Sequence, residues 1–287
     1  MTKFAIACFF VLATALAGAG AARAQDTMTG QWSIQRVLGS TVQLEFRTER
    51  RADGTAHWDS TNTSDVSRIG LSSADLDSSG KHVHFTIARE AGTFECDGWA
   101  GHGQGSGTFA FNASPAFLAG LRSRGYSDLS PEKQAGSAML DITLGYIDSI
   151  FAAGYPHVEY NQLVAFKALG VTPTSIAALR SLFHDNLTAE ELTSLAALHV
   201  TPAYISELRG LGIAPVSPQK AVELKALGVD KSYVQALAAA GYTNVPPDQL
   251  VQLKALGIDQ AYIQHLADHG MKNLTVSQLV RMKAVGL

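Results

Sequence analysis

The sequence predicts an α+β protein in which a small antiparallel β-sheet domain precedes an α-solenoid of six 29-residue helix-pair repeats. Two patterns in the 287-residue chain support this fold class. Apolar residues recur at every second position from Gln31 to about Asn112, which is the period of strands that bury one face. From about residue 115 onward the chain repeats itself every 29 residues, which is typical of stacked-repeat proteins. We therefore expect a β domain over residues 25–114 and a helical repeat domain over residues 115–287.

The chain begins with a predicted export signal over residues 1–24. Lys3 precedes an apolar stretch from Phe4 to Leu16, and Ala22-Arg23-Ala24 forms a small-residue cleavage site before Gln25. No second apolar run of about 20 residues follows, so we expect no membrane span after cleavage. The sequence thus predicts a bacterial protein of the periplasm or of the cell exterior.

The charge balance argues against a nucleic-acid partner. The full chain carries a net charge of −3, and removal of residues 1–24 takes away two basic residues and no acidic one. An acidic protein lacks the excess of Lys and Arg that binds a phosphate backbone. With 46% apolar and 16% charged residues the chain has a globular composition, which excludes a disordered protein.

The alternation in residues 25–114 predicts five or so antiparallel strands. Their inward side chains form the sets Trp32 and Ile34; Val42, Leu44 and Phe46; Val83, Phe85 and Ile87; Phe94 and Cys96; and Phe109 and Phe111. Turns are expected at Asp53-Gly54, Ser79-Gly80 and Ala91-Gly92. The stretch Thr61–Asp77 breaks the alternation, so we expect a connection there with at most one helical turn. Because such a sheet has one apolar face, it must curl or be covered, and the neighbouring helices are the nearest cover.

The 29-residue repeat is clearest in a five-residue phrase. Lys167-Ala168-Leu169-Gly170-Val171 returns as Lys225–Val229, Lys254–Ile258 and Lys283–Leu287, and Ala196–Val200 is a variant of it. Six units can be aligned in this way, and the first carries Asp141 at the glycine position.

Each unit is predicted to contain two short helices. A column of side chains able to cap the free amides of the first helix consists of Thr143, Thr172, Thr201, Asp230 and Asp259. The second helix starts at Ser130, Thr188, Ser217 or Thr275 in four of the units, with capping-box spacing from Thr188 to Glu191 and from Thr275 to Gln278.

Stacking is required because the predicted helices are too short to stand alone. Helices of about ten residues are marginal in water, so neighbouring units must share their apolar stripes. No seventh unit covers the last pair. Leu279, Met282 and Val285 are therefore expected to meet a partner, a second copy, or only the chain end, and self-association through this C-terminal repeat is one of these alternatives.

Two columns on the solenoid are candidate binding residues: Tyr146, Tyr204, Tyr233 and Tyr262, and Lys167, Lys225, Lys254 and Lys283. Tyrosine is enriched at protein interfaces, although packing between units explains this column equally well. The lysines would suit an acidic partner, or they form the ordinary solvated face of a repeat.

The β domain offers one alternative site. His82 and His84 leave the same strand face and could bind zinc if His57, His102 or Asp97 supplied a third ligand. Val83 and Phe85 mark the opposite face as buried, so we favour two solvated histidines and expect no metal or cofactor. The segment Gly101–Gly107 is predicted to be a flexible hairpin loop, because the phosphate cradle that it also suggests needs a following helix.

No motif predicts catalysis. The chain lacks a His-Glu-x-x-His motif, a Gly-x-Ser-x-Gly elbow and a P-loop. Cys8 lies within the predicted signal, and Cys96 alternates with Phe94, which predicts a buried and inert thiol. We therefore expect that the protein is not an enzyme.

Several phrases carry a resemblance to a known family. Thr201-Pro202-Ala203-Tyr204-Ile205, Tyr262-Ile263-Gln264-His265-Leu266 and Ser277–Ala284 resemble the tandem helical repeats that accompany bacterial β-lactam-sensor-type membrane metallopeptidases (antirepressors). Ala88–Phe94 and Gly105–Phe111 resemble the β module that precedes such repeats. This chain lacks the family's zinc motif and membrane helices, so the resemblance carries over no catalytic residue and implies a recognition or sensing appendage.

The sequence predicts a non-enzymatic exported protein that binds or scaffolds another protein, or acts in sensing, through the solenoid surface. The alternative is a metal- or carbohydrate-binding protein or enzyme with its site on the β domain near His82, His84 and Trp99.

Overall fold

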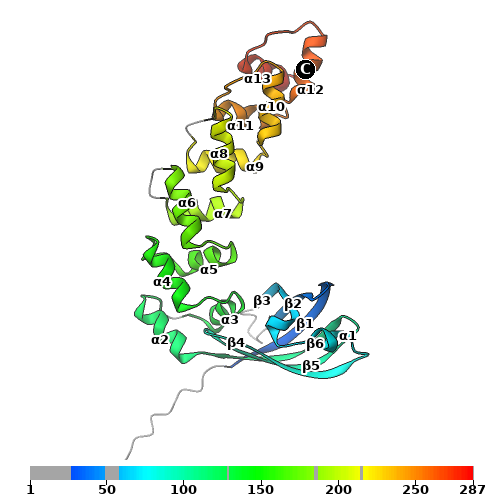
Figure 1. Ribbon diagram of the computed structural model, residues 1–287, viewed down its shortest axis with the longest axis vertical. Coiled ribbons are helices and arrows are strands. Elements are labelled where there is room, and N and C mark those ends of the chain that lie inside the picture. Colours follow the sequence, from blue (N-terminus) through cyan, green and yellow to red (C-terminus); the bar gives the residue numbers. More distant parts are fainter. Residues whose placement is uncertain (1–26, 49–57, 128, 184–186, 214–215, 287) are drawn as a thin grey trace, which may run out of the picture.

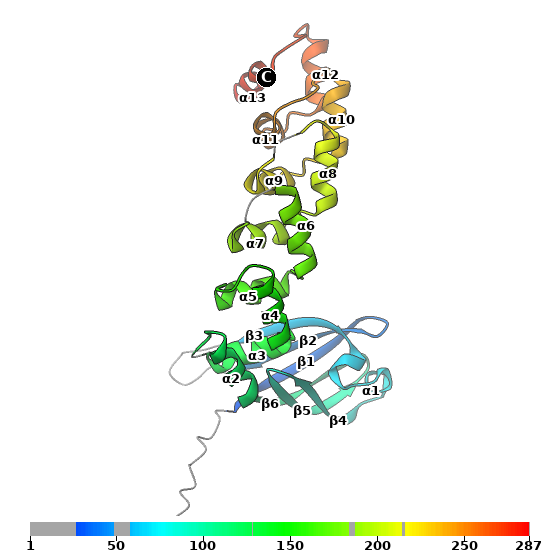
Figure 2. The ribbon, with the colours of Figure 1, turned by 60° about the vertical axis from the view of Figure 1, so that its left-hand side comes forward.

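The computed structural model describes residues 27–48, 58–127, 129–183, 187–213 and 216–286. It confirms the α+β fold class, because a six-stranded antiparallel sheet is followed by a run of helices of similar length. The helices climb away from the sheet as an elongated, curved stack (Figure 1) and separate into two columns when the molecule is turned (Figure 2). The predicted signal over residues 1–24 and the predicted turn at Asp53-Gly54 lie outside the described residues.

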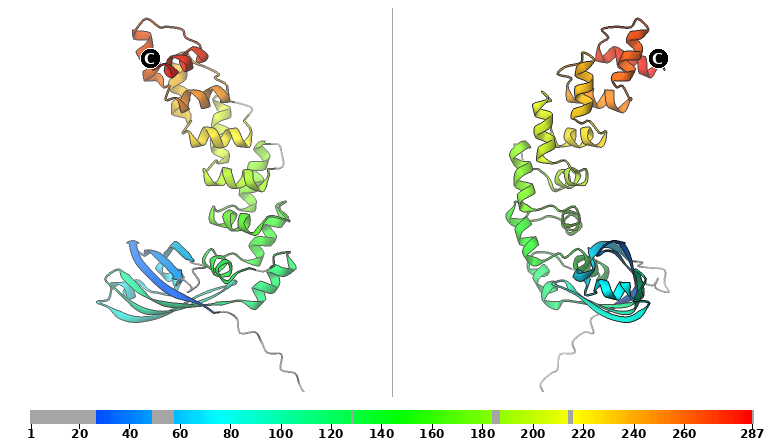
Figure 3. Two further views of the ribbon diagram at one scale, coloured as in Figure 1. Left: turned by 180° about the vertical axis from the view of Figure 1, so that it is seen from behind. Right: turned by 45° about the vertical axis from the view of Figure 1, so that its right-hand side comes forward.

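The sheet contains β1 (Met28–Leu38), β2 (Thr41–Thr48), β3 (Asp59–Asp65), β4 (Lys81–Arg89), β5 (Gly92–Gly101) and β6 (Gln104–Ala113). Their order is β3-β2-β1-β6-β5-β4, with every neighbouring pair antiparallel, so two three-stranded meanders meet at β1 and β6. The sheet curls strongly (Figure 3). The short helix η1 (Val66–Ile69) packs against β3 and β4, the two edge strands, and spans the open side of the curl.

The core of the β domain lies inside this curl. All the predicted inward side chains are at most 5% exposed: Trp32, Ile34, Val42, Leu44, Phe46, Val83, Phe85, Ile87, Phe94, Cys96, Phe109 and Phe111. Helix α1 (Ser73–Asp77) packs against β5, and α3 (Pro131–Met139) packs against β3, β5 and β6. Curling and helix cover therefore act together to remove the apolar face from water.

Two sequence predictions about the β domain are wrong. The predicted connection over Thr61–Asp77 includes most of strand β3, which the apolar alternation missed because this edge strand carries Asp, Ser, Thr and Asn. The predicted flexible loop over Gly101–Gly107 is mostly strand, since β5 ends at Gly101 and β6 begins at Gln104. Only His102 and Gly103 form the turn, and both have positive φ.

The helices follow the 29-residue period in two columns. The first helices of the units are α2 (Pro115–Ser123), α4 (Leu144–Ala152), α6 (Pro173–Phe183), α8 (Pro202–Gly210), α10 (Lys231–Ala239) and α12 (Gln260–Asp268). The second helices are α3, α5 (Tyr160–Ala168), α7 (Ala189–Ala197), α9 (Pro218–Ala226), α11 (Pro247–Ala255) and α13 (Val276–Ala284). Helices pack on the same column of the next unit, as α5 on α7 and α6 on α8, which is solenoid stacking.

The predicted helix starts are confirmed. The side chains of Thr143, Thr172, Thr201, Asp230 and Asp259 each accept a hydrogen bond from the backbone amide three residues later. Both predicted capping boxes, at Thr188 and Thr275, are formed. The second helices end in a left-handed residue, which is Gly170, Gly228, Gly257 or Gly286 in four units and Asp141 or His199 in the other two. The left-handed backbone that ends the second helix is thus kept in the two units that lack the glycine of the five-residue phrase.

The first unit joins the solenoid to the sheet. The strands end at Ala113 and α2 begins at Pro115. The Asn62 side chain on β3 donates to the carbonyl of Met139 at 3.2 Å, and the carboxylate of Glu90 accepts from the amide of Leu144 at 3.2 Å. These contacts hold α3 and the start of α4 against the β domain.

At the other end of the solenoid, the three residues singled out in the last unit differ in exposure. Leu279 is fully buried in its own stack, Met282 is half-buried, and Val285 is 73% exposed. The last unit therefore offers a small apolar surface rather than a full uncovered stripe.

Candidate binding surfaces

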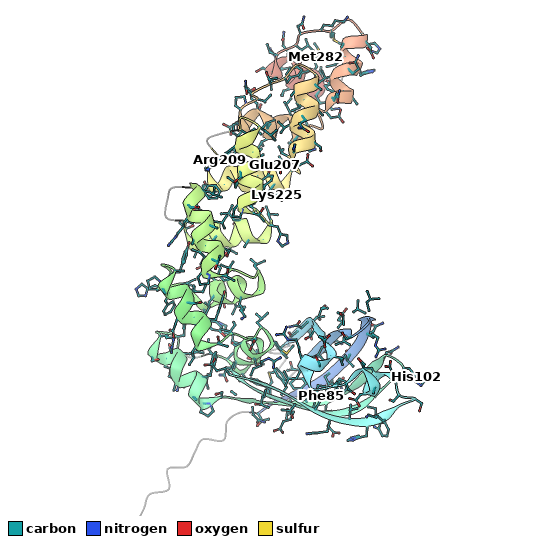
Figure 4. All side chains as sticks on the ribbon, in the orientation of Figure 1. Phe85, His102, Glu207, Arg209, Lys225 and Met282 are labelled. Atoms are coloured by element: carbon teal, nitrogen blue, oxygen red, sulfur yellow. The ribbon has the colours of Figure 1, made fainter. Side chains whose placement is uncertain are left out.

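The two candidate columns on the solenoid come together in the structure. Each lysine ammonium lies over the ring of the tyrosine 21 residues earlier, at 4.8 Å for Lys167 and Tyr146, 4.6 Å for Lys225 and Tyr204, 4.1 Å for Lys254 and Tyr233, and 4.3 Å for Lys283 and Tyr262. Figure 4 labels Lys225 on the second helix of its unit, α9, and Glu207 and Arg209 on the first helix, α8. All four lysines are half-buried. Each pair is a cation–π contact that joins the two helices of one unit.

The tyrosine hydroxyls satisfy backbone carbonyls between units. Tyr146 donates to the carbonyl of Val171 at 3.0 Å, and Tyr204 and Tyr233 donate to the equivalent carbonyls of Val229 and Ile258, each at 2.8 Å. These carbonyls lie in the turn that leads to the next unit. Tyr204 and Tyr233 are only 6% and 7% exposed, so their rings offer a partner little area.

Burial also changes the acidity of these tyrosines and predicts sensitivity to alkali. It raises the pKa of Tyr146, Tyr204 and Tyr233 to about 12, against about 10 for a free tyrosine. Since the folded pKa is the higher one, this contribution to stability is complete below about pH 10 and is lost as the pH rises through about 12.

We expect the double variant Tyr204→Phe and Tyr233→Phe to be less stable at pH 7 by about 1–3 kcal/mol, because two buried carbonyls lose their donors. Its stability should fall less steeply than wild type between about pH 10 and 12, since two of the titrating hydroxyls are gone. Urea unfolding followed by far-ultraviolet circular dichroism at several pH values measures both effects. If the stability of the two proteins falls equally steeply with rising pH, the raised pKa values of Tyr204 and Tyr233 do not contribute to the alkaline loss of stability.

A second tyrosine column was missed at the level of sequence. Tyr126, Tyr155 and Tyr242 donate to the carbonyls of Val158, Leu187 and Leu274, at 2.8, 2.9 and 2.7 Å. Each of these carbonyls lies 32 residues later, just before the second helix of the next unit. The 29-residue spacing of Tyr126 and Tyr155 was the available signal, and it indicates stacking rather than binding.

The exposed sides of the second helices α5, α7, α9, α11 and α13 form a continuous surface, here called the second-helix face. Val164, Val222, Val251 and Val280 occupy equivalent, half-buried positions on it. Between α7 and α9 the face carries a groove of about 560 Å³ whose lining includes Val222 and three carboxylates, Glu190, Glu191 and Glu223, and no basic residue. Lys220 lies beside this groove and is held by Glu223 and by Asp248 of α11, the latter at 2.8 Å.

On the β domain, the structure brings the candidate histidines together around Asp97. His82 Nε2 lies 3.0 Å and His84 Nδ1 lies 3.6 Å from the Asp97 carboxylate, and all three side chains are more than half exposed. Of the other predicted ligands, His102 contacts the carbonyl of Ser79, and His57 lies outside the described residues. Within the part of the chain that the structure describes, no group of three or more His, Cys, Asp or Glu side chains is arranged to hold a metal ion.

Two other predicted residues of the β domain have clear environments. Cys96 is fully buried, and this burial raises the pKa of its thiol to about 12, so the thiol stays protonated near neutral pH. Trp99 is 62% exposed on the outer face of the sheet, where its ring packs nearly perpendicular to that of His82.

Neither a protein-family model nor a curated protein matches this chain. The resemblance to the repeats of membrane metallopeptidases therefore stays a prediction. Among the described helices no single one is long and apolar enough to cross a membrane, and the pair α5 and α6 meets that test only jointly, across a bend of 96°.

Proposed function

We propose that this protein is a non-enzymatic, exported binding protein whose solenoid holds another protein, as a scaffold or as the recognition part of a sensor. The observation that carries the proposal is the second-helix face, a surface repeated from α5 to α13. The stack is stabilised by its buried side chains, so the exposed side chains of this face are free to contact a partner. Repeat stacks of this kind present long surfaces suited to protein recognition. Export to the periplasm or beyond is part of the proposal and rests on residues 1–24.

The groove between α7 and α9 favours a basic partner segment. Glu190 and Glu223 lie on its two walls, and Val222 supplies an apolar floor contact. An incoming Lys or Arg would meet Glu190 on the α7 side and would compete with Lys220 for Glu223 on the α9 side, while the aliphatic part of its side chain could cover Val222. The lysine column would contribute less, because each ammonium already lies over a tyrosine ring.

Site-specific photo-crosslinking tests this assignment in cells. A photoreactive amino acid at Gln219, in the groove, is expected to yield an adduct with a partner protein, because this position faces the bound segment. The matched control is Ser206, an exposed position on the first helix of the same unit. It is expected to yield no such adduct.

Reversing the charge of one groove residue tests whether the crosslink at Gln219 depends on the carboxylates. Glu190→Lys should reduce the Gln219 adduct at least fivefold, because it removes one of the opposite charges, and raised salt should act in the same direction. Adducts of equal yield at Gln219 and Ser206, or an adduct unaffected by Glu190→Lys, would rule out this groove as the binding surface.

A further inference from the structure

The outer face of the β sheet carries a continuous groove, here called the outer groove, along the two central strands β1 and β6. Several outward side chains of these strands are short, including Ser33, Ser106, Thr108 and Ala110, and the glutamines between them are uncharged. Strands β2 and β5 on either side carry longer outward side chains, including Glu45, Arg47, Asp97 and Trp99. Short side chains flanked by long ones leave a trough between two walls.

Three hollows of about 450, 430 and 450 Å³ follow one another along this trough. The first and second share Ser33, Glu45 and Ser106, and the second and third share Gln31 and Thr108. From Gln104 to Ala110 the trough follows β6 for roughly 20 Å at the rise of an extended strand. It is therefore elongated rather than a closed pocket, and it suits a linear ligand.

The strand register arranges the walls in rows. Glu45, Ser33, Ser106 and Trp99 are successive cross-strand neighbours in one row. In the next row the corresponding residues are Arg47, Gln31, Thr108 and Asp97. Each row thus places hydroxyl or amide groups on the floor, a charged group on one wall, and either the indole ring or a carboxylate on the other.

Trp99 is the residue of the outer groove that would contribute most to the affinity for a ligand. In the described part of the chain it is the one aromatic residue among the strongly exposed large apolar side chains. The ring of its cross-strand neighbour His82 lies nearly perpendicular to the indole, with ring centroids 5.7 Å apart, and this contact limits how the indole can turn. An exposed and constrained indole offers a flat apolar area at low entropic cost.

Most of the charged side chains along the outer groove already have a partner nearby. Arg47 pairs with Glu45 at 2.6 Å and with Asp59 at 3.3 Å, and Asp97 lies 3.0 Å from His82. An anionic ligand would be repelled by Glu45, Glu95 and Asp97, and a basic ligand would have to compete with Arg47 for Glu45. A sugar chain fits instead, because its C–H faces stack on an aromatic ring while its hydroxyls exchange hydrogen bonds with amides, hydroxyls and carboxylates.

We propose that the outer groove binds a linear neutral oligosaccharide, with one sugar ring stacked on Trp99. This site is separate from the second-helix face, so the protein would join a glycan at its β domain to a partner protein at its solenoid. An experiment that excludes glycan binding at the outer groove does not bear on protein binding at the second-helix face, and the reverse also holds.

Isothermal titration calorimetry of the full mature chain tests this proposal with defined probes. The panel contains cellohexaose, xylohexaose, maltohexaose and chitohexaose, with hexagalacturonic acid as an anionic probe and hexa-lysine as a basic peptide. At least one neutral hexasaccharide is expected to bind, and more tightly than its disaccharide, because the groove is elongated.

Three variants locate the site. Trp99→Ala is expected to weaken binding at least tenfold, and Trp99→Phe should retain part of the affinity because a ring remains. Val37→Ala is the matched control, since Val37 is a comparably exposed apolar side chain of the same domain, at 59%. The proposal is overturned if no neutral hexasaccharide binds, if only the charged probes bind, or if Trp99→Ala binds as tightly as Val37→Ala.

Discussion

Replacing Gly107 by alanine is expected to destabilise the β domain by about 3 kcal/mol or more, although Gly107 lies in a strand and needs no left-handed backbone. An added Cβ would lie 2.0 Å from the carbonyl oxygen of Asp97 and 2.7 Å from the Cα of Gly98. Both neighbours are backbone atoms of β5, so no side chain can move aside to relieve the clash.

At Gly107 the strands β5 and β6 approach each other closely, next to the core residue Trp32. Gly107 pairs with Gly98 on one side and with Trp32 on the other, and the indole of Trp32 donates to the carbonyl of Asp97 at 3.2 Å. A larger residue would push β5 away from β6 next to Trp32. The expected loss therefore combines overpacking with damage to this buried contact.

Tryptophan fluorescence during urea unfolding measures the effect of Gly107→Ala, because Trp32, Trp58 and Trp99 are the three tryptophans of the chain and all lie in the β domain. Gly136→Ala in α3 is the control. A Cβ there meets nothing within 4 Å, so alanine should be neutral or stabilise by up to about 1 kcal/mol. A Gly107→Ala variant as stable as wild type would contradict the tight packing of β5 on β6.

Replacing Leu224 by alanine is expected to destabilise the solenoid by about 2–5 kcal/mol. Leu224 is fully buried on α9, which packs against both α7 and α11. The cavity would weaken two unit interfaces at once. Because each unit contacts only its neighbours, we expect the units beyond α9 to unfold before the rest, which broadens the helical transition.

Far-ultraviolet circular dichroism reports this loss of helix, while tryptophan fluorescence follows the β domain separately. The fluorescence transition of Leu224→Ala should stay within about 0.5 kcal/mol of wild type. Leu256→Ala is the matched control, because Leu256 lies at the end of α11 in the next unit but is 38% exposed, and it should cost less than about 1 kcal/mol. If Leu224→Ala shifts both probes equally, the chain unfolds as one cooperative body and the repeat description of its stability fails.

Much of the solenoid could be predicted because its signals are local. A capping residue such as Thr201 acts on amides within three residues, and the turn at Gly228 needs only a left-handed residue at that position. Strand β3 could not be predicted in the same way. Its side chains are polar because it lies at the sheet edge, and that position follows from the pairing with β2 rather than from its own residues.

The candidate sites could be predicted only in part. The tyrosine and lysine columns were visible as separate periodic features, but their contact depends on how the two helices of a unit cross. Asp97 was among the predicted neighbours of His82 and His84, and register places it beside both. The outer groove had no sequence signature, because its floor and walls come from four strands.

The sequence by itself determined the order of the two domains, the inward residues of most strands and the beginning of most helices. These features depend on interactions between residues close along the chain, and periodicity records them. Only the tertiary structure decided that the glycines of Gly101–Gly107 belong to tightly packed strands, that each lysine lies on a tyrosine, and where surface grooves form. Those outcomes depend on backbone distances between segments far apart in the chain, which no local pattern encodes.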